Sequence, residues 1–283
     1  MKRKEFLRKG LTSIAGLTAV GAMANQSEKS IVDVVGFNHL PLESSTSGNT
    51  VLHKAQSRGH ANHGWLDSHH SFSFANYYNP ERMNFGALRV LNDDIVSAGR
   101  GFRTHPHENM EIISIPISGD LKHKDSMGNE QIIRQGDVQV MSAGKGIFHS
   151  EFNRSDVENV QFLQIWLFPN RKDVQPRYDQ ISLDIERRKN RWDQILSPSM
   201  HDDGVWIHQN AWFHMTDLET DKSLNYDLKI PKNGVYLFVI SGEVEVEGHT
   251  LMQRDAFGIW DVDFISLKSK SKAELLLIEV PMA

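Results

Sequence analysis

Two stretches far apart in the chain follow the same pattern, Ile117-Ser118-Gly119-Asp120 and Ile240-Ser241-Gly242-Glu243. In each stretch a hydrophobic run ends at serine, glycine and an acidic residue, which is typical of a strand that enters a hairpin. A second turn that carries an aspartate follows in both copies, at Gly136-Asp137 and at Arg254-Asp255. The repeat predicts two related β-barrels, with a single large sandwich as the alternative.

Short runs of β-branched, aromatic and aliphatic residues surround both copies of the repeat. They recur between glycine-containing turns, a spacing that is typical of sandwiches and small barrels. Helical periodicity is weak and is visible only in the short charged segment 184–191. The fold class predicted is therefore all-β. The expected strands cover residues 87–90, 111–117, 138–141, 162–168, 205–209, 235–240, 243–247 and 275–280.

The same runs predict where the two barrels begin and end. We expect an N-terminal barrel over residues 50–168 and a C-terminal barrel over residues 200–283. Residues 169–199 between them are rich in charge and contain Pro169, Pro176 and Pro198, so we expect a linker there.

The first 24 residues have the features of an export signal. Residues 1–10 are basic, residues 11–24 carry no charge, and Ala22-Met23-Ala24 matches a small-x-small cleavage pattern. The uncharged stretch is short for a hydrocarbon core of about 30 Å, so a cleaved signal peptide is favoured over an uncleaved anchor or a buried amphipathic helix. We expect a flexible segment over residues 25–49 and a periplasmic mature protein. Export would use the Sec route or, because Arg3-Lys4-x-Phe6-Leu7-Arg8 resembles its signal, the twin-arginine route.

The composition excludes several classes of protein. Of 283 residues, 39% are hydrophobic and 24% are charged, which is ordinary for a soluble globular protein. The formal net charge is -5, and residues 1–24 contribute +4 to it, so the rest of the chain is strongly acidic and has no general attraction for nucleic acid. Cysteine is absent, which excludes disulfides, zinc–thiolate sites and thiol nucleophiles.

Histidine is the residue type with a chemical pattern. His105-Pro106-His107 places two imidazoles two residues apart, so on an extended strand both rings point to one face. The proline between them favours an edge or bulged strand, because it cannot donate a hydrogen bond to a neighbouring strand. His149-Ser150-Glu151 repeats the spacing with one imidazole and one carboxylate. If a hairpin brings the two pairs together, three imidazoles and a carboxylate suit a divalent Fe, Mn, Co, Ni or Zn ion.

Other polar residues have weaker patterns. Glu111 lies four residues after His107 with the same strand parity, so it is either a competing ligand or a neighbour of the site. The remaining histidines with candidate spacings never repeat at two residues, so we expect neither a second metal site nor a metal in the C-terminal barrel. They are His60, His63, His69, His70, His201, His208, His214 and His249.

Two longer stretches around the histidine pairs resemble a known family. Residues 101–107, Gly-Phe-Arg-Thr-His-Pro-His, are similar to the first metal motif of the cupins, and residues 136–151 resemble the second motif in the form found in pirins. The resemblance covers about residues 50–283 and is closest to the bacterial pirins that cleave quercetin, although the metal motif is missing from the second barrel. Further segments that fit the same family are 58–60, 70–74, 166–169, 176–178 and 207–210.

The resemblance to the pirins implies a bicupin with two double-stranded β-helix barrels. It implies a metal held by His105, His107, His149 and Glu151, with Glu151 favoured over Glu111 as the fourth ligand. The metal implied is Fe(II), with Mn, Co, Ni, Cu and Zn as alternatives. The activity implied is O₂-dependent ring cleavage of quercetin-type flavonols or related enols, with Glu151 accepting the enol proton. The expected partners are a small-molecule substrate and O₂, without nucleic acid and, after signal cleavage, without a membrane anchor.

Two other interpretations remain open at this point. One is a non-catalytic metal-binding or redox-sensing bicupin, because a metal site with open positions does not prove turnover. The other is a metal-free bicupin similar to stress proteins or sugar epimerases. Oxygen uptake with quercetin and metal analysis of the purified protein distinguish the three.

Overall fold

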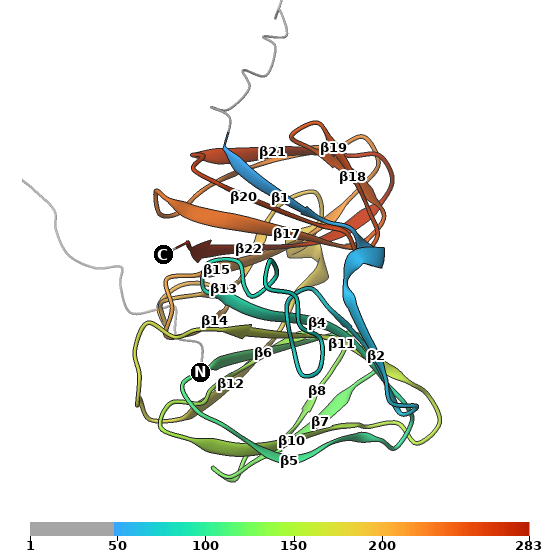
Figure 1. Cartoon of the computed structure of the whole chain (residues 1–283), viewed down its shortest axis with the longest axis vertical. Coiled ribbons are helices and arrows are strands. Elements are labelled where there is room, and N and C mark those ends of the chain that lie inside the picture. Colours follow the sequence, from blue (N-terminus) through green and yellow to red (C-terminus); the bar gives the residue numbers. More distant parts are fainter. Residues whose placement is uncertain (1–47, 283) are drawn as a thin grey trace, which may run out of the picture. The chain divides into compact units, whose positions relative to one another are not determined.

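The computed structural model describes residues 48–282, and its regular structure consists of strands with two short 3-10 helices, η1 (Ala55–Ser57) and η2 (Ile185–Arg188). The strands form two sheets of seven and two of four. Each seven-stranded sheet has a four-stranded partner, which gives two barrels (Figure 1). The all-β prediction is therefore confirmed. η2 occupies the charged segment 184–191, where the Asp184 side chain accepts a hydrogen bond from the Glu186 amide.

The N-terminal barrel is built entirely from antiparallel pairs. Its seven-stranded sheet contains, in spatial order, β12 (Arg177–Ser182), β9 (Asp137–Ser142), β6 (Glu111–Ser118), β11 (Val160–Leu167), β4 (Leu88–Val96), β3 (Leu66–His70) and β2 (Gly59–Asn62). Its four-stranded sheet contains β5 (Gly101–His107), β10 (Ile147–Asn153), β7 (Leu121–Asp125) and β8 (Glu130–Ile133).

The C-terminal barrel has one parallel pair, β13 with β14, among antiparallel neighbours. Its seven-stranded sheet contains β1 (Asn49–His53), β20 (Ala256–Trp260), β17 (Asn233–Ser241), β22 (Ala273–Pro281), β15 (Trp212–Leu218), β13 (Asp193–Ser197) and β14 (Val205–Trp206). Its four-stranded sheet contains β16 (Ser223–Asp227), β21 (Phe264–Ser269), β18 (Glu243–Val246) and β19 (His249–Met252).

The two barrels share one strand order, which confirms the predicted repeat. β6 and β17 each lie third in their seven-stranded sheet, and the two Ser-Gly-acid turns lead from β6 to β7 and from β17 to β18. Gly119 and Gly242 have φ values of 74° and 85° in these turns. Glycine adopts this left-handed conformation without the strain that a side chain would add, which is why both copies of the pattern carry it.

The predicted linker contains strands, and β1 begins at the last residue of the predicted flexible segment. β12 lies within residues 169–199 and pairs with β9, while β13, in the same segment, pairs with β15 of the C-terminal barrel. β1 begins inside residues 25–49 and pairs with β20. β1 and β12 escaped detection because they are edge strands with mostly half-exposed side chains, so they need no hydrophobic run.

A large hydrophobic cluster joins the two seven-stranded sheets. Leu163 and Ile165 of β11 belong to it together with Tyr236 and Phe238 of β17. Leu237, which lies between the last two and points to the other face, belongs to a second cluster in the interior of the C-terminal barrel. The central strands are therefore buried on both faces, which explains why their sequences read as continuous hydrophobic runs.

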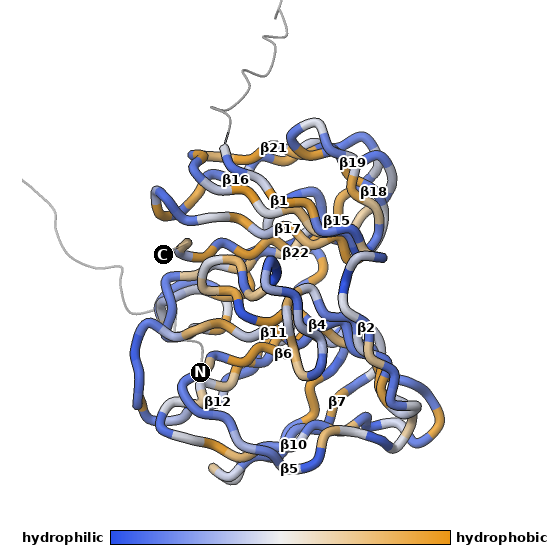
Figure 2. The backbone as a smooth tube through the Cα atoms, viewed as in Figure 1, coloured by the Kyte–Doolittle hydropathy of each residue, from blue (hydrophilic) through white to orange (hydrophobic). Residues whose placement is uncertain are grey.

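The interiors of the two barrels differ in polarity. Apolar side chains such as Val244, Leu251 and Ile265 fill the C-terminal interior. The corresponding cluster around Phe162 in the N-terminal barrel is smaller. In Figure 2, β17 and β21 are coloured mainly as hydrophobic, whereas much of β5 is hydrophilic. The interior of the N-terminal barrel is therefore less completely filled with apolar side chains than that of the C-terminal barrel.

The predicted signal peptide, residues 1–24, and residues 25–47 of the predicted flexible segment lie outside the described residues. Among the residues that the structure describes, we find no helix with the length and hydrophobicity needed to cross a membrane.

Candidate metal centre

Three neighbouring strands of the N-terminal four-stranded sheet each carry a pair of candidate ligands at a spacing of two residues. The pairs are His105 and His107 on β5, His149 and Glu151 on β10, and His123 and Asp125 on β7. His149 lies opposite His105 on one side and opposite Asp125 on the other. Glu151 lies opposite His123. Because side chains alternate along a strand, this register places the pairs on one face of the sheet.

The proline in the first pair has the structural role that the sequence predicted. β5 is an edge strand, so Pro106 leaves no gap in the hydrogen bonding of an inner strand. The pairing of β10 with β5 also shifts register between His149 and Glu151, which marks a bulge. The prediction of an edge or bulged strand at His105-Pro106-His107 is confirmed.

The imidazoles of His105, His107 and His149 come together in one cluster. Their ring centroids are 4.4 Å to 4.9 Å apart, and one nitrogen of each ring lies within 4.8 Å of the others. The edge of Trp166 packs against His107, with 4.8 Å between ring centroids. Three imidazole nitrogens in this arrangement suit a single divalent transition metal ion.

The nitrogens of this imidazole cluster are available to a ligand. His107 Nε2 and both ring nitrogens of His149 are buried without a hydrogen-bond partner, which is rare for buried polar atoms. His105 Nδ1 donates to the carbonyl oxygen of Arg103 at 2.7 Å, which leaves Nε2 as the nitrogen with a lone pair. Burial, helped by the neighbouring imidazoles, lowers the pKa of both His107 and His149 to about 3. Both rings are therefore neutral, the form that binds metal, and the residues fit a divalent ion.

Glu151 lies beside the imidazole cluster and is held by two other side chains. Ser114 Oγ donates to one carboxylate oxygen and Gln164 Nε2 to the other, each at 2.7 Å. The carboxylate forms a close group with His149 and His123, and the close group of three imidazoles does not include it. Each oxygen retains a free lone pair, so coordination of a metal by Glu151 stays a prediction.

His123 is a candidate that the sequence analysis missed. Its side chain is completely buried, its Nε2 lies 3.2 Å from Asp125 Oδ2, and its Nδ1 has no partner. Its ring centroid is 5.4 Å from that of His149. His123-Lys124-Asp125 has the same spacing as the other two pairs, and that signal would have identified it.

Glu111, which the sequence offered as a competing ligand, lies outside the imidazole cluster. Residues 108–110 carry the chain from β5 to β6, which belong to different sheets, so the parity argument that linked Glu111 to His107 is wrong. The Glu111 carboxylate accepts a hydrogen bond from Ser142 Oγ at 2.6 Å, and burial raises its pKa to about 7. Glu111 belongs to none of the close groups of histidine and carboxylate side chains among residues 48–282.

A further close group lies on the hairpin of β2 and β3 and consists of His60, Asp67 and His69. It forms because His60 and His69 are paired across the two strands, which single-strand spacing does not reveal. The two rings stack with 4.4 Å between their centroids and an angle of 14° between their planes, and His60 Nε2 lies 2.7 Å from Asp67 Oδ1. In the C-terminal barrel, His214 packs against Tyr226, and burial lowers its pKa to about 3.

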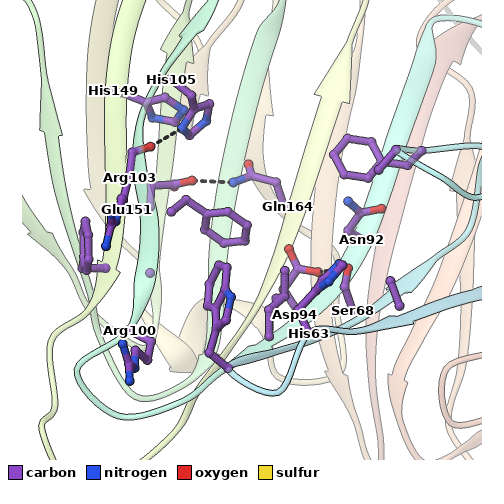
Figure 3. Close-up of a pocket in the computed structure, with 18 of the residues that line it drawn as sticks. His63, Ser68, Asn92, Asp94, Arg100, Arg103, His105, His149, Glu151 and Gln164 are labelled. Carbon is purple, nitrogen blue, oxygen red and sulfur yellow. Dashed lines mark hydrogen bonds between the residues drawn. The ribbon is translucent and has the colours of Figure 1, made fainter.

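The imidazole cluster borders a cavity of about 940 Å³ in the N-terminal barrel. Residues of β3, β4 and β11 form one wall, and residues of β5 and β10 form the opposite wall. Figure 3 shows His105 and His149 at one end of this pocket and Asp94 and Ser68 at the other, with Gln164 between them. A concave, partly aromatic pocket with a few polar groups is typical of a small-molecule site. The aromatic lining consists of Trp65, Phe74, Phe102, Phe152 and Trp166.

Two family models match the chain. The model described as Pirin matches residues 51–167, and the model described as Quercetinase C-terminal cupin domain matches residues 194–280. A protein of Escherichia coli K12 named quercetin 2,3-dioxygenase is 43% identical over 230 residues, which cover 81% of this chain and 98% of that protein. A pirin-like protein of Caulobacter vibrioides is 39% identical over 222 residues, which cover 78% of this chain and 95% of that protein.

A solved structure is similar over both barrels. The crystal structure of the bacterial pirin YhhW from Escherichia coli in complex with nickel(II) matches with a TM-score of 0.79 and 40% identity. The match covers 83% of this chain and 100% of that chain.

Proposed function

Because this chain belongs to the pirin family and has its bicupin fold, we propose that it is a metal-dependent dioxygenase that cleaves quercetin-type flavonols or related enols with O₂. The proposed metal is Fe(II), with Mn, Co, Ni, Cu and Zn as alternatives. The observation that carries the proposal is the cluster of imidazoles with unpartnered nitrogens at the border of a cavity large enough for a flavonol.

Each part of the site has a role in this chemistry. His105, His107 and His149 would hold the metal, with Glu151 as the proposed fourth ligand. A divalent ion bound there supplies Lewis acidity, which makes an enol hydroxyl placed against it more acidic. Glu151 then accepts the enol proton, and the hydrogen bonds from Ser114 and Gln164 hold its carboxylate in one orientation. The resulting enolate is electron-rich enough to react with O₂.

Metal analysis and oxygen uptake test the proposal. The protein is purified without a histidine tag, analysed for bound metal, and reloaded separately with Fe(II) and with each alternative ion. We expect one ion per chain, and with quercetin we expect O₂ consumption together with loss of flavonol absorbance. Bound metal without O₂ consumption would favour the non-catalytic, metal-binding alternative. A protein that binds no metal would contradict both.

We also propose that the protein is exported. Residues 1–24 have a basic start, an uncharged stretch and a cleavage pattern, so the mature chain would begin near Asn25 and act in the periplasm. Cell fractionation and N-terminal sequencing test this location.

A further inference from the structure

We propose that the pocket has a second polar end, where Asp94 and Ser68 bind a hydroxyl group of the substrate that is remote from the reacting enol. This inference rests on the proposed function, since it assigns the part of the substrate that the metal does not hold. It restricts the substrate class to flavonols or related enols with a phenolic hydroxyl far from the enol. Figure 3 shows the two ends of the pocket, with the imidazoles at one and Asp94 with Ser68 at the other.

The second polar end is part of a strip across the seven-stranded sheet. Asp94 of β4 lies directly opposite Ser68 of β3. In the next row on the same face, Asn92 of β4 lies between His70 of β3 and Gln164 of β11. His70 Nδ1 is 2.9 Å from Asn92 Oδ1. All of these side chains line the cavity, so the strip leads from Asp94 to Gln164, which donates to the proposed proton acceptor.

Asp94 has fewer hydrogen bonds than the buried carboxylates of Asp137 and Glu279. Its side chain is buried, and its one hydrogen-bond donor among residues 48–282 is the neutral hydroxyl of Ser68. A carboxylate offers about four lone-pair sites, so most of its capacity to accept is unused. By contrast, the buried Asp137 accepts from three donors and the buried Glu279 from four. The hydrogen bonds of Asp137 and Glu279 connect neighbouring loops and strands, whereas Asp94 lines a cavity.

The burial of Asp94 is costly without a ligand. Desolvation raises its pKa to about 7, and the negative charges of Asp93 and Glu151 act in the same direction. Buried polar groups in proteins are normally satisfied, and an exception in a pocket calls for a ligand that completes it. A phenolic hydroxyl is a donor of suitable size, and the carboxyl group has an oxygen free to accept from it in either protonation state.

The space between the two polar ends suits a flat, aromatic molecule. The ring centroids of Trp166 and Phe74 are 5.4 Å apart, in an edge-to-face arrangement. Those of Trp65 and Phe102 are 5.3 Å apart, in the same arrangement. All four residues line the cavity. Aromatic rings of a ligand pack favourably against such walls, so a polyphenol with an enol at one end and a hydroxyl at the other matches the pocket.

Two ligands that share the enol and differ in the remote hydroxyls test the inference. The probes are quercetin and 3-hydroxyflavone, which keeps the enol and its neighbouring ketone and has no other hydroxyl. Each is titrated into metal-loaded protein without oxygen, so that binding is measured without turnover. We expect the wild-type protein to prefer quercetin. At a pH above 7, where Asp94 is ionised, Asp94→Asn should weaken quercetin binding by about tenfold or more and leave 3-hydroxyflavone binding within about twofold, because only quercetin loses a hydrogen bond to a charged acceptor.

Matched variants separate recognition from damage to the fold. Ser68→Ala should weaken quercetin binding in the same direction and less strongly, and it carries the test if Asp94→Asn does not fold. Asp67→Asn, which alters a part-exposed carboxylate one residue before Ser68, should change neither affinity. Equal loss of both ligands in Asp94→Asn, or loss of neither, would overturn the inference while leaving the proposed function intact. If the wild-type protein binds neither ligand, the proposed function fails and the inference fails with it.

Discussion

Replacing the carboxylate of Glu151 by an amide would separate the charge of this side chain from its hydrogen bonding. After Glu151→Gln, the amide oxygen can accept from Gln164, and the amide nitrogen can donate to the Ser114 hydroxyl. That hydroxyl is then free to donate to Gln164 Oε1, which is 3.3 Å away. Each of the two bonds present in the wild-type protein has a replacement, so we expect the free energy of unfolding of the metal-free protein to change by less than about 1 kcal/mol.

The charge of Glu151 has no such replacement. An amide is a weak metal ligand and cannot accept the enol proton. We therefore expect the dissociation constant of the metal to rise by about 10-fold to 100-fold. With the metal site saturated, we expect turnover of quercetin to fall by about 100-fold or more, which is the usual contribution of a positioned proton acceptor.

Three measurements on the same variant test this reasoning. Thermal unfolding of the metal-free protein reports the fold, competition with a chelator reports metal affinity, and an oxygen electrode reports turnover. Glu111→Gln is the matched control, because Glu111 is also a buried carboxylate that accepts from a serine and lies outside the imidazole cluster. If Glu151→Gln oxidises quercetin at the wild-type rate while Glu111→Gln loses metal and turnover, the assignment of Glu151 is wrong.

His149→Ala and His105→Ala should each abolish stoichiometric metal, because loss of one ligand opens the site and loosens the others; full occupancy by elemental analysis in either variant would contradict the ligand set. Burial raises the pKa of Glu111 from 4.5 to about 7, so the folded protein binds this proton more tightly than the unfolded chain does. Stability should therefore fall by up to about 3 kcal/mol as the pH rises from about 4.5 through about 7. Glu111→Gln should lose this part of the pH dependence in thermal unfolding, and parallel curves for variant and wild type would refute it. Neutral residues in place of both Arg3 and Lys4 should keep the precursor in the cytoplasm, whereas a wild-type protein found there with its first residue intact would rule out export.

The parts of the fold that could be predicted are those whose burial leaves a mark on the sequence. Residues 235–240 and 275–280 are buried on both faces and read as continuous hydrophobic runs, so β17 and β22 were found. The histidine pairs were found because alternation along a strand is a local property. β1 and β12 left no such mark, since an edge strand with part-exposed side chains looks like a loop.

The sequence analysis missed His123 and linked Glu111 to His107, and both errors concern properties that depend on the tertiary structure. His123 has the same two-residue spacing to Asp125 as the other pairs, but its burial between the exposed Lys122 and Lys124 is visible only in the tertiary structure. Glu111 shares parity with His107, but parity applies within one strand, and no local pattern shows that the chain changes sheet between them.

Each barrel binds a segment from the other end of the described chain. β1 pairs with β20, so Asn49 lies opposite Trp260, and the carbonyl oxygen of Pro281 accepts a hydrogen bond from the Ala87 amide at 2.9 Å. During synthesis β1 therefore leaves the ribosome long before β20 exists and stays unpaired until residues 256–260 have emerged. Contacts of such long sequence separation slow folding. A gene fragment that stops before residue 169 would encode a barrel without β12 and with a β1 that has no sheet to join.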